Sequence, residues 1–427
     1  MLKMKLHWQI LIALVLAVFA GMLAGTQASI FDVRFYDMFN FIGTLFLNAM
    51  KMIIVPLIGS SIIVGIAGVG GTVGLGRLGG KTLLYYLATS LVAILTGLIL
   101  VNLFSPGIIE GQPARDVLGL DVEQAAIATD KVGSRGVGDI ADVFLSMVPP
   151  NIVAAAADGQ MLGLIFFSLL FGYFMTRIGE SRQDMQLNFW QGVYHTMMKI
   201  TDFIMKFAPL GVFGLVAKVI AGIDPEQVGE LAASLGVFFI TVVLALAVHV
   251  FITLPVLLKF IGRVRPSRQY VAMAPALLTA FSTASSSATL PLTLDCVEKN
   301  AKVSNRTSSF VLPLGATVNM DGTALYECVA AIFIAQAYGL ELSFTTQFVI
   351  VLVALLTSIG VAGIPAASLV AITIILTTIG LPLEALGLIL AVDRILDMFR
   401  TAVNVFSDSC GAVIIARTEG EKGILES

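Results

Sequence analysis

The chain has 427 residues, of which 57% are hydrophobic and only 12% are charged, and its formal net charge is −3. Soluble domains have about 25% charged residues, so this composition argues against a water-soluble enzyme, and the acidic balance offers no basic surface for nucleic acid. The 3 cysteines are too few for a disulfide framework. Length and composition together indicate a protein that crosses a lipid bilayer several times.

Apolar runs long enough to cross a bilayer, about 20 residues each, recur along the whole chain. They predict eight spans, near 8–29, 36–67, 80–106, 140–176, 190–221, 226–262, 306–338 and 384–416. Two further apolar stretches, about 265–299 and 341–381, are interrupted by small polar residues, glycine and proline. The expected fold is therefore an all-α polytopic membrane protein with eight transmembrane helices and two re-entrant helical hairpins.

The basic residues predict which side of the membrane each loop faces. If the N-terminus is inside and each hairpin enters and leaves on one side, most loop lysines and arginines fall on the cytoplasmic side. The external segments then contain only Arg34, Arg115, Lys131 and Arg135. We expect a multi-pass protein of the cell (inner) membrane with cytoplasmic N- and C-termini.

The two interrupted stretches show the same order of features. The first contains S-T-A-S-S-S-A-T-L-P at 282–291 and precedes a span with N-M-D-G-T at 319–323. The second contains S-I-G-V-A-G-I-P at 358–365 and precedes a span with D-M-F-R-T-A-V-N at 397–404. One stretch would enter from inside and the other from outside, which is typical of the inverted repeats of secondary transporters. The alternative, two exposed linkers, fits poorly with the Phe, Leu and Val on both sides of each break.

Several charged residues fall inside the last two expected spans. They are Asp393, Arg394, Asp397, Arg400 and Asp408 in the last span, and Asp321 and Glu327 in the one before it. A charge at the bilayer centre costs about 2.5–3.5 kcal/mol even on the lenient scale, which favours a functional site. The structural alternative is mutual pairing, since Arg394 lies three residues before Asp397 on the same helix face.

Helical spacing places the polar residues of the last span in one stripe. These residues are Asp393, Asp397, Arg400, Thr401, Asn404 and Asp408. An arginine can bind a carboxylate through two hydrogen bonds, and an aspartate can bind an ammonium group. The stripe therefore suits a substrate that carries both groups. Asp321, Asp408 and Asn319 provide the oxygen ligands that a hard cation prefers.

Four motifs resemble those of the glutamate/aspartate:cation symporter family, which includes the excitatory amino acid transporters and prokaryotic dicarboxylate/amino acid:cation symporters. They are A-S-S-S at 284–287, N-M-D-G-T at 319–323, G-I-P at 363–365 and D-M-F-R-T-A-V-N at 397–404. The resemblance implies a homotrimer in which each chain moves a transport domain past a scaffold, an elevator-type mechanism. It implies scaffold segments at 1–79 and 140–225, the second with the trimer contacts, and transport segments at 80–139 and 226–427.

The resemblance also implies roles for individual residues. The substrate would contact Arg400, Asp397, Asn404, Thr401, Thr323, Ser286 and Ile364, with Arg400 on its side-chain carboxylate and Asp397 on its amino group. The three cation sites would use Gly315, Asn319, Asn404 and Asp408; Thr317, Met320, Ser358, Ile359 and Val361; and Tyr86, Thr89, Ser90, Asn319 and Asp321. Sodium ions are the implied cotransported cations.

Two positions depart from the archaeal members of that family. They have arginine at the tip of the first hairpin, where this chain has Ala284, and we expect Arg394 to supply that charge and tune the site. They have glutamine where this chain has Glu327, and the excitatory carriers have glutamate there. We expect Glu327 to carry a proton, because desolvation disfavours an ionised carboxyl group. Potassium countertransport stays open.

The expected function is sodium-coupled symport of L-aspartate or L-glutamate rather than catalysis. A C4-dicarboxylate or neutral amino-acid symporter of the same family is the main alternative, although Asp397 would repel the former and Arg400 would stay unpaired with the latter. An intramembrane protease with paired aspartates is a remote alternative. Its G-x-G-D string, at 136–139, lies in an expected external loop. His7, His195 and His249 lie far apart and lack metal-ligand spacing.

Overall fold

The computed structural model describes residues 6–69, 76–118, 145, 147–158, 161–223, 227–340, 342–360 and 367–426. The helices of the first half are α1 (Leu6–Ala24), α2 (Phe35–Val69), α3 (Gly76–Phe104), α4 (Ala114–Leu118), α7 (Ile152–Ala157), α8 (Met161–Met175), α9 (Glu180–Met205) and α10 (Ala208–Gly222). The second half begins with α11 (Val228–Val248), the π-helix η2 (His249–Thr253), α12 (Leu254–Phe260), α13 (Pro266–Thr283), α14 (Ser286–Asp295) and the π-helix η3 (Cys296–Asn300). It continues with α15 (Asn305–Val318), α16 (Asp321–Ala337), α17 (Phe344–Gly360), α18 (Ala367–Ile379), the short 3₁₀ helix η4 (Leu383–Ala385) and α19 (Leu386–Thr418).

The described part of the chain is mostly helical, in agreement with the predicted class, and it also contains two very short strand pairs. The strands β1 (Ser29–Ile30) and β2 (Val33–Arg34) form one antiparallel pair, and β3 (Ile108–Ile109) and β4 (Gln112–Pro113) form another. Both pairs are closed by two residues with positive φ, at 31–32 and 110–111, as expected for tight hairpin turns. Strands of two residues are too short to leave an alternating pattern in the sequence.

Several of the described helices are long and apolar enough to cross a membrane. Four segments meet that criterion, at 35–67, 77–104, 228–260 and 305–337, and α9 with α10 makes a fifth if this pair, bent by 56°, is one span. The helices α1 and α8 are shorter, and α19 carries the charged stripe. The fold thus fits a polytopic membrane protein, whereas the count of eight spans stays a prediction. The expected fourth span begins at 140, and residues 119–144 lie outside the described part of the chain.

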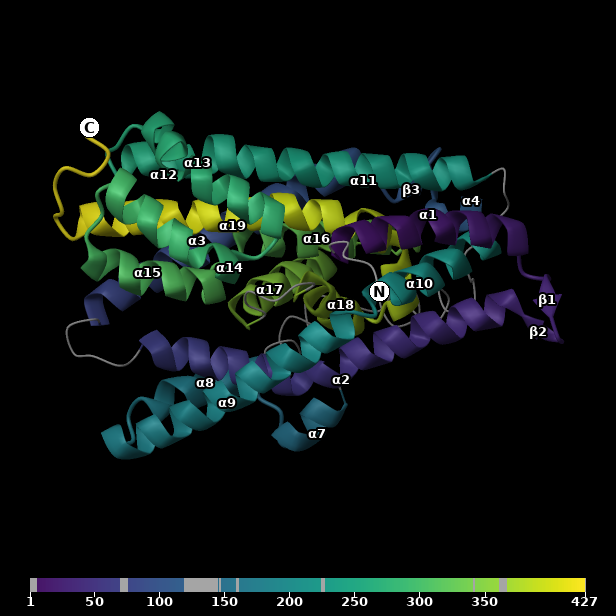
Figure 1. Ribbon diagram of the computed structural model, residues 1–427, viewed down its shortest axis with the longest axis horizontal. Helices are drawn as coiled ribbons and strands as arrows, with labels where there is room; N and C mark the ends of the chain where they lie inside the picture. Colours follow the sequence, from purple (N-terminus) through teal and green to yellow (C-terminus); the bar gives the residue numbers. More distant parts are fainter. Residues whose placement is uncertain are drawn as a thin grey trace.

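The helices form two groups that lie side by side (Figure 1). In one group α1 packs on α10, and α2 packs on α8, α9 and α10. In the other, α16 packs on α3 and α19, while α13 and α15 also contact α19. The helices α10 and α19 join the two groups. The helix that carries the predicted polar stripe therefore contacts both.

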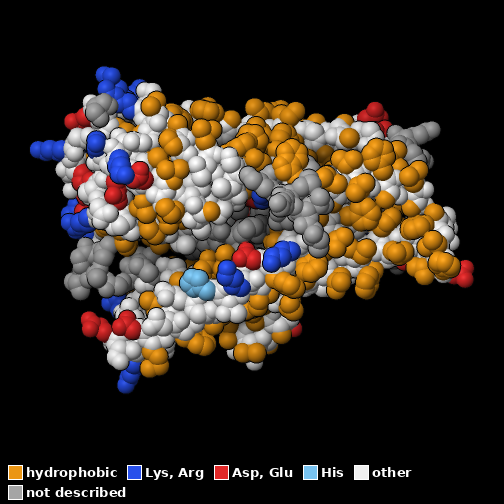
Figure 2. All heavy atoms as spheres, in the orientation of Figure 1, with side chains coloured by type: hydrophobic (Ala, Val, Ile, Leu, Met, Phe, Trp, Pro, Cys, Tyr) orange, Lys and Arg blue, Asp and Glu red, His pale blue; other side chains and the backbone are white. Residues whose placement is uncertain are grey.

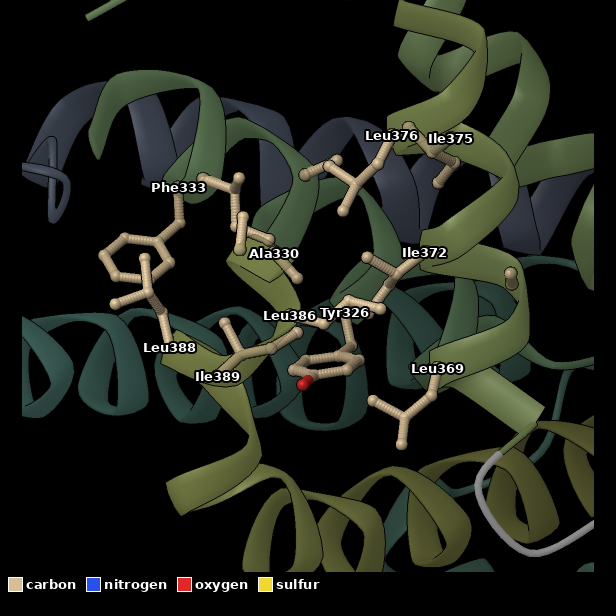
Figure 3. Close-up of a cluster of buried hydrophobic side chains, with 14 of the residues drawn as sticks. Tyr326, Ala330, Phe333, Leu369, Ile372, Ile375, Leu376, Leu386, Leu388 and Ile389 are labelled. Carbon is tan, nitrogen blue, oxygen red and sulfur yellow. The ribbon is translucent and has the colours of Figure 1, made fainter. Parts of the chain in front are cut away.

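The core beside the stripe is formed by α16, α18 and α19 (Figure 3). Its labelled side chains are Tyr326, Ala330 and Phe333 of α16, Leu369, Ile372, Ile375 and Leu376 of α18, and Leu386, Leu388 and Ile389 of α19. Every residue of α16 is buried. Because buried polar groups need hydrogen-bond partners, each polar residue of α16 must find one inside the protein.

The first interrupted stretch folds as a hairpin of two helices. α13 ends at Thr283, Ala284 adopts a left-handed conformation with φ of 49°, and Ser285 caps α14 by accepting a hydrogen bond from the Ala288 N–H at 3.2 Å. This cap and the left-handed residue let the chain reverse within two residues. In the second stretch, α17 packs on α18, and the joining residues 361–366 lie outside the described part of the chain.

The C-terminal residues after α19 fold back onto the base of the first hairpin. Glu421 accepts hydrogen bonds from the Ser304 N–H at 2.9 Å, from Ser304 Oγ at 2.6 Å and from Thr307 Oγ1 at 2.6 Å. The Arg268 guanidinium donates to the Leu425 carbonyl at 2.6 Å. Partial burial alone would raise the pKa of Glu421, but the donors of Ser304 and Thr307 outweigh it, and the pKa is lowered.

We expect Glu421→Gln to lower the melting temperature of the purified protein by about 2 °C at pH 7. A depressed pKa in the folded state stabilises the fold above the unfolded pKa, about 4.3 for Glu, and this contribution disappears as the pH falls through the folded value. The difference between variant and wild type should therefore shrink below about pH 4. Glu426→Gln is the control, because Glu426 is 66% exposed. An effect of Glu421→Gln that is independent of pH would contradict the ionic account.

Candidate functional site

The site forms where α19 passes the break between α15 and α16. The break consists of Asn319 and Met320, which do not have helical backbone angles. Asn404 of α19 bridges it: the Asn404 Oδ1 accepts from the Gly322 N–H at 2.8 Å, and its Nδ2 donates to Thr323 Oγ1 at 3.0 Å. Asn404 thereby fixes the first turn of α16 against α19, between two clusters of buried charge.

The first cluster is centred on Arg400, which is fully buried. Its Nη2 donates to Asp393 Oδ1 at 3.1 Å and to Asp397 Oδ1 at 3.0 Å. The guanidinium carbon lies 3.9 Å from the centre of the Tyr326 ring, a cation–π contact beside the apolar core of Figure 3. Among the described residues, Arg400 Nε and Nη1 have no hydrogen-bond partner. An incoming carboxylate would accept from one of these two nitrogens, because the Nε–H and the Nη1–H groups lie on different flanks of the planar guanidinium.

Arg394 joins the same cluster from one turn earlier. Its Nη1 donates to Asp397 Oδ2 at 3.1 Å, and its side chain is 19% exposed. The pairing that the i, i+3 spacing predicted is present, and it coexists with the Arg400 contacts. A cavity reaches this cluster, lined by Asp393, Arg394 and Asp397 and by apolar residues of α1, α2, α9, α10 and α18. Asp397 is thus shared by two arginines at the edge of a cavity.

The second cluster contains two carboxylates, Asp321 and Asp408, which are 0% and 3% exposed. Ser90 Oγ donates to Asp321 Oδ1 at 2.6 Å, and Ser407 Oγ donates to Asp321 Oδ2 at 2.5 Å. Asn319 Nδ2 donates to Asp408 Oδ1 at 2.9 Å and to Ser407 Oγ at 3.1 Å. The five side chains therefore form one connected network.

Neither carboxylate of this second cluster forms an ion pair with a lysine or arginine in the part of the chain that the structure describes. Burying an uncompensated charge is costly. A cation bound by oxygen ligands would supply the missing charge, and the carboxylate, amide and hydroxyl oxygens of the cluster suit a hard ion.

The predicted cation ligands are brought together unequally. Of the first and third sets, Gly315 lies against Asp408 and Tyr86. Thr89 Oγ1 donates to the Tyr85 carbonyl of its own helix at 3.0 Å and lies 3.5 Å from Asn319 Oδ1. In the second set, the hydroxyl groups of Thr317 and Ser358 form no hydrogen bond with each other. Each donates to a carbonyl of its own helix, that of Leu314 and that of Leu355 respectively. Val361 lies outside the described residues, as does the predicted substrate contact Ile364, and the side chain of Ile359 is not described.

The remaining predicted substrate contacts border the first cluster in different ways. Thr323 accepts the hydrogen bond from Asn404. Thr401 donates to the Asp397 carbonyl at 2.8 Å, so its hydroxyl bonds its own helix. Ser286 is the first residue of α14 and is buried.

Glu327 is fully buried on α16. Thr357 of α17 donates to Glu327 Oε2 at 2.9 Å, whereas Oε1 has no partner among the described residues. One donor leaves an ionised carboxylate poorly compensated at such a site. A proton on Glu327 would compensate it.

Two residues of the network were not predicted, Ser407 and His249. His249 Nε2 lies 3.1 Å from Asp321 Oδ2, and both side chains are fully buried. The two residues are 72 positions apart in the sequence, so no spacing argument could predict their contact. The available signal was the isolated histidine in the apolar run 226–262, since ionisable residues inside spans are functional candidates.

We expect Gly315→Ala to weaken cation binding. A Cβ at this position would lie 2.7 Å from Asp408 Cγ and 2.7 Å from Tyr86 Oη, so the Asp408 carboxylate would have to move. The half-saturating sodium concentration, measured by the rise of the melting temperature of the purified protein, should rise about tenfold, a typical cost of disturbing ligand geometry. Gly59→Ala is the control, because its nearest neighbour is Ser168 Oγ at 3.9 Å. An unchanged sodium dependence in Gly315→Ala would show that Asp408 does not bind the cation.

Apolar helices of membrane-crossing length that surround buried charges and a broken helix are typical of secondary transporters. Residues 6–418 match the sodium:dicarboxylate symporter family. The chain belongs to this family, which confirms the resemblance found in its motifs.

Similar proteins span the full length of the chain. It is 37% identical over 425 residues to a proton/glutamate-aspartate symporter of Escherichia coli, covering 98% of this chain and 94% of that protein. It is 36% identical over 423 residues to a proton/sodium-glutamate symport protein of Geobacillus stearothermophilus, covering 99% and 96%. It is 36% identical over 457 residues to human excitatory amino acid transporter 3, covering 97% and 86%.

Proposed function

We propose that this protein is a secondary active symporter that takes up L-aspartate, L-glutamate or both together with sodium ions and a proton. The observation that carries the proposal is the Arg400 guanidinium, which is buried beside Asp397 with two nitrogens unused by the described residues. The names of the relatives support the same substrates, since the Escherichia coli protein is named for glutamate, aspartate and a proton. The Geobacillus stearothermophilus protein is named for a proton, sodium and glutamate.

In this proposal the first cluster binds the substrate. Arg400 donates to the side-chain carboxylate from one of its two unused nitrogens, Nε or Nη1. Asp397, which pairs with Arg394 and Arg400, accepts from the amino group. Asn404 and Thr323 complete the contacts from α19 and α16. The same residues argue against a dicarboxylate without an amine, because Asp397 would repel it.

The second cluster binds sodium in this proposal. Asp321 and Asp408 provide the negative charge, with Asn319 and the hydroxyl groups of Ser90 and Thr89 as neutral ligands. One net positive charge moving through about 100 mV supplies about 2.3 kcal/mol, which is close to a fiftyfold gradient of the substrate. Each additional cation raises that limit.

The proposed transport motion follows the grouping of the helices. Segments 1–79 and 140–225 are the scaffold, with trimer contacts in the second, and 80–139 and 226–427 are the elevator-type transport domain. The pairs α13–α14 and α17–α18 are the re-entrant hairpins. Basic side chains gather at the end of the molecule where the C-terminus lies (Figure 2), among them the exposed residues Lys259, Arg263, Arg265, Lys302 and Arg306. Their position supports a cytoplasmic C-terminus in a cell (inner) membrane, and we propose a cytoplasmic N-terminus from the distribution of the loop charges alone.

Uptake of labelled aspartate into proteoliposomes tests the proposal directly. Sodium, pH and potassium gradients are imposed one at a time, with the membrane potential clamped. We expect accumulation with an inward sodium gradient and more with an acidic exterior. An outward potassium gradient tests the open question of countertransport. No uptake under any of these gradients would refute symport of acidic amino acids.

Competition distinguishes the substrate classes in the same vesicles. We expect unlabelled aspartate or glutamate to block uptake, and succinate and serine to have little effect. Dominant inhibition by succinate would favour the C4-dicarboxylate alternative. Dominant inhibition by serine would favour the neutral amino-acid alternative.

A further inference from the structure

His249, the first residue of η2, contacts Asp321 of the second cluster. The proposed function gives this histidine no role. Its Nε2 lies 3.1 Å from Asp321 Oδ2, and both side chains are 0% exposed. A carboxylate oxygen can only accept, so Nε2 carries the hydrogen. The other ring nitrogen, Nδ1, has no partner among the described residues. The single hydrogen-bond donor of this buried imidazole is therefore directed at Asp321, and the acceptor Nδ1 is not used by the described residues.

The three donors to Asp321 differ in what they can do when a cation arrives. Ser90 and Ser407 approach with hydroxyl groups, which can rotate their hydrogens away and present an oxygen to the ion. The Nε2–H of His249 has a fixed direction and offers no oxygen. His249 is thus the partner that keeps its hydrogen bond while the hydroxyl groups change theirs.

The backbone around His249 is itself unusual. It begins the π-helix η2, in which the Leu254 N–H reaches back to the His249 carbonyl. Such single π turns inside α-helices are frequent at functional sites. Tyr270 of α13 donates to the neighbouring Val250 carbonyl at 2.5 Å, which fixes this turn against the first hairpin. The position of the imidazole is therefore held from two elements.

We propose that His249 is a positioning residue for the cation that binds at Asp321. By holding Oδ2, it orients the carboxylate so that Oδ1 faces the oxygen ligands from α3, in the way that outer partners orient the ligands of metal sites. This proposal rests on the proposed sodium coupling. It adds a residue that acts on sodium affinity through Asp321 and does not touch the amino acid.

The test is a sodium titration of the purified full-length protein without amino acid, followed by the rise of its melting temperature. We expect His249→Leu to raise the half-saturating sodium concentration about tenfold. The aspartate dissociation constant at saturating sodium should change less than about twofold. His249→Gln should stay within about threefold of the wild type, because its amide nitrogen reaches the place of Nε2. His195→Leu is the control, since His195 is exposed on α9 and contacts its own helix.

If His249→Leu does not fold, His249→Asn replaces it, because its amide nitrogen lies at the place of Nδ1, short of Asp321. Wild-type sodium affinity in the Leu or Asn variant would overturn the proposal. So would equal impairment in His249→Gln, since shape and not the donor would then matter. A wild-type protein that does not respond to sodium would refute sodium coupling itself, and this is visible before any variant is made.

Discussion

Arg400→Cys should lower aspartate uptake by at least about tenfold, since the loss of one charge-assisted hydrogen bond to the carboxylate costs about 1.5–3 kcal/mol. It should also allow uptake of small neutral amino acids such as serine. In the variant the carboxylate of aspartate meets Asp393 and Asp397 without a counter-charge, because both of these now bond Arg400 Nη2. Serine presents no second carboxylate, and Asp397 still binds its amino group.

The measurement is initial uptake of labelled aspartate and serine in the same proteoliposomes. Arg400→Lys is the matched control: it keeps the charge but loses the planar fork, so it should prefer aspartate with reduced affinity. Melting temperatures of both variants show whether the loss of a buried ion pair has unfolded the protein. Unchanged aspartate affinity in Arg400→Cys would defeat the assignment of this residue to the substrate carboxylate.

The sequence was sufficient to predict the first cluster, the one centred on Arg400, because its charged residues lie on one helix. Asp393, Asp397 and Arg400 are related by three and four residues, and helical geometry alone brings them together. The same holds for the first hairpin, whose reversal at Ala284 falls inside the polar break of the sequence. Local sequence patterns, the helical spacing in one case and the polar break in the other, thus predicted the first cluster and the position of the hairpin turn.

The second cluster, around Asp321 and Asp408, could not be predicted in this way because its contacts join helices that are remote in the sequence. Asp321 meets Ser90 across 231 positions and Ser407 across 86, and no local pattern encodes such distances. Asp321, Asp408 and Asn319 were predicted from their oxygen-bearing side chains, whereas Ser90 came from the family resemblance, and neither source indicated Ser407 or His249. The structure adds these two because the buried carboxylate of Asp321 needs hydrogen-bond donors, and Ser407 and His249 both contact its Oδ2.

The two clusters and Glu327 are connected through α16. Asp321, Thr323 and Glu327 follow one another at two and four residues along this fully buried helix. Asp321 belongs to the second cluster. Thr323 accepts a hydrogen bond from Asn404, and Glu327 accepts one from Thr357 of α17. The three residues therefore lie on one buried helix, and Glu327 is the one of them that contacts α17.

Glu327→Gln should abolish the response of transport to a proton gradient. For one cotransported proton at clamped membrane potential, each pH unit across the membrane contributes about 1.4 kcal/mol, a tenfold change in the accumulation of aspartate. Gln has the same shape and can still accept from Thr357 through its carbonyl oxygen, but it binds no proton. We expect the variant to accumulate aspartate with sodium alone, at a ratio that is the same at every imposed pH difference.

Glu230→Gln is the matched control for this experiment. It makes the same chemical change on α11, where Glu230 Oε2 is also buried without a partner among the described residues, and it should keep the tenfold response. If the Glu327→Gln vesicles still respond to pH, another group carries the proton. If they respond to neither sodium nor pH, the carboxyl group of Glu327 is required for transport itself, and the proton cannot be assigned to it as a separate cotransported ion. Only the loss of the pH response with the sodium response intact supports Glu327 as the proton carrier.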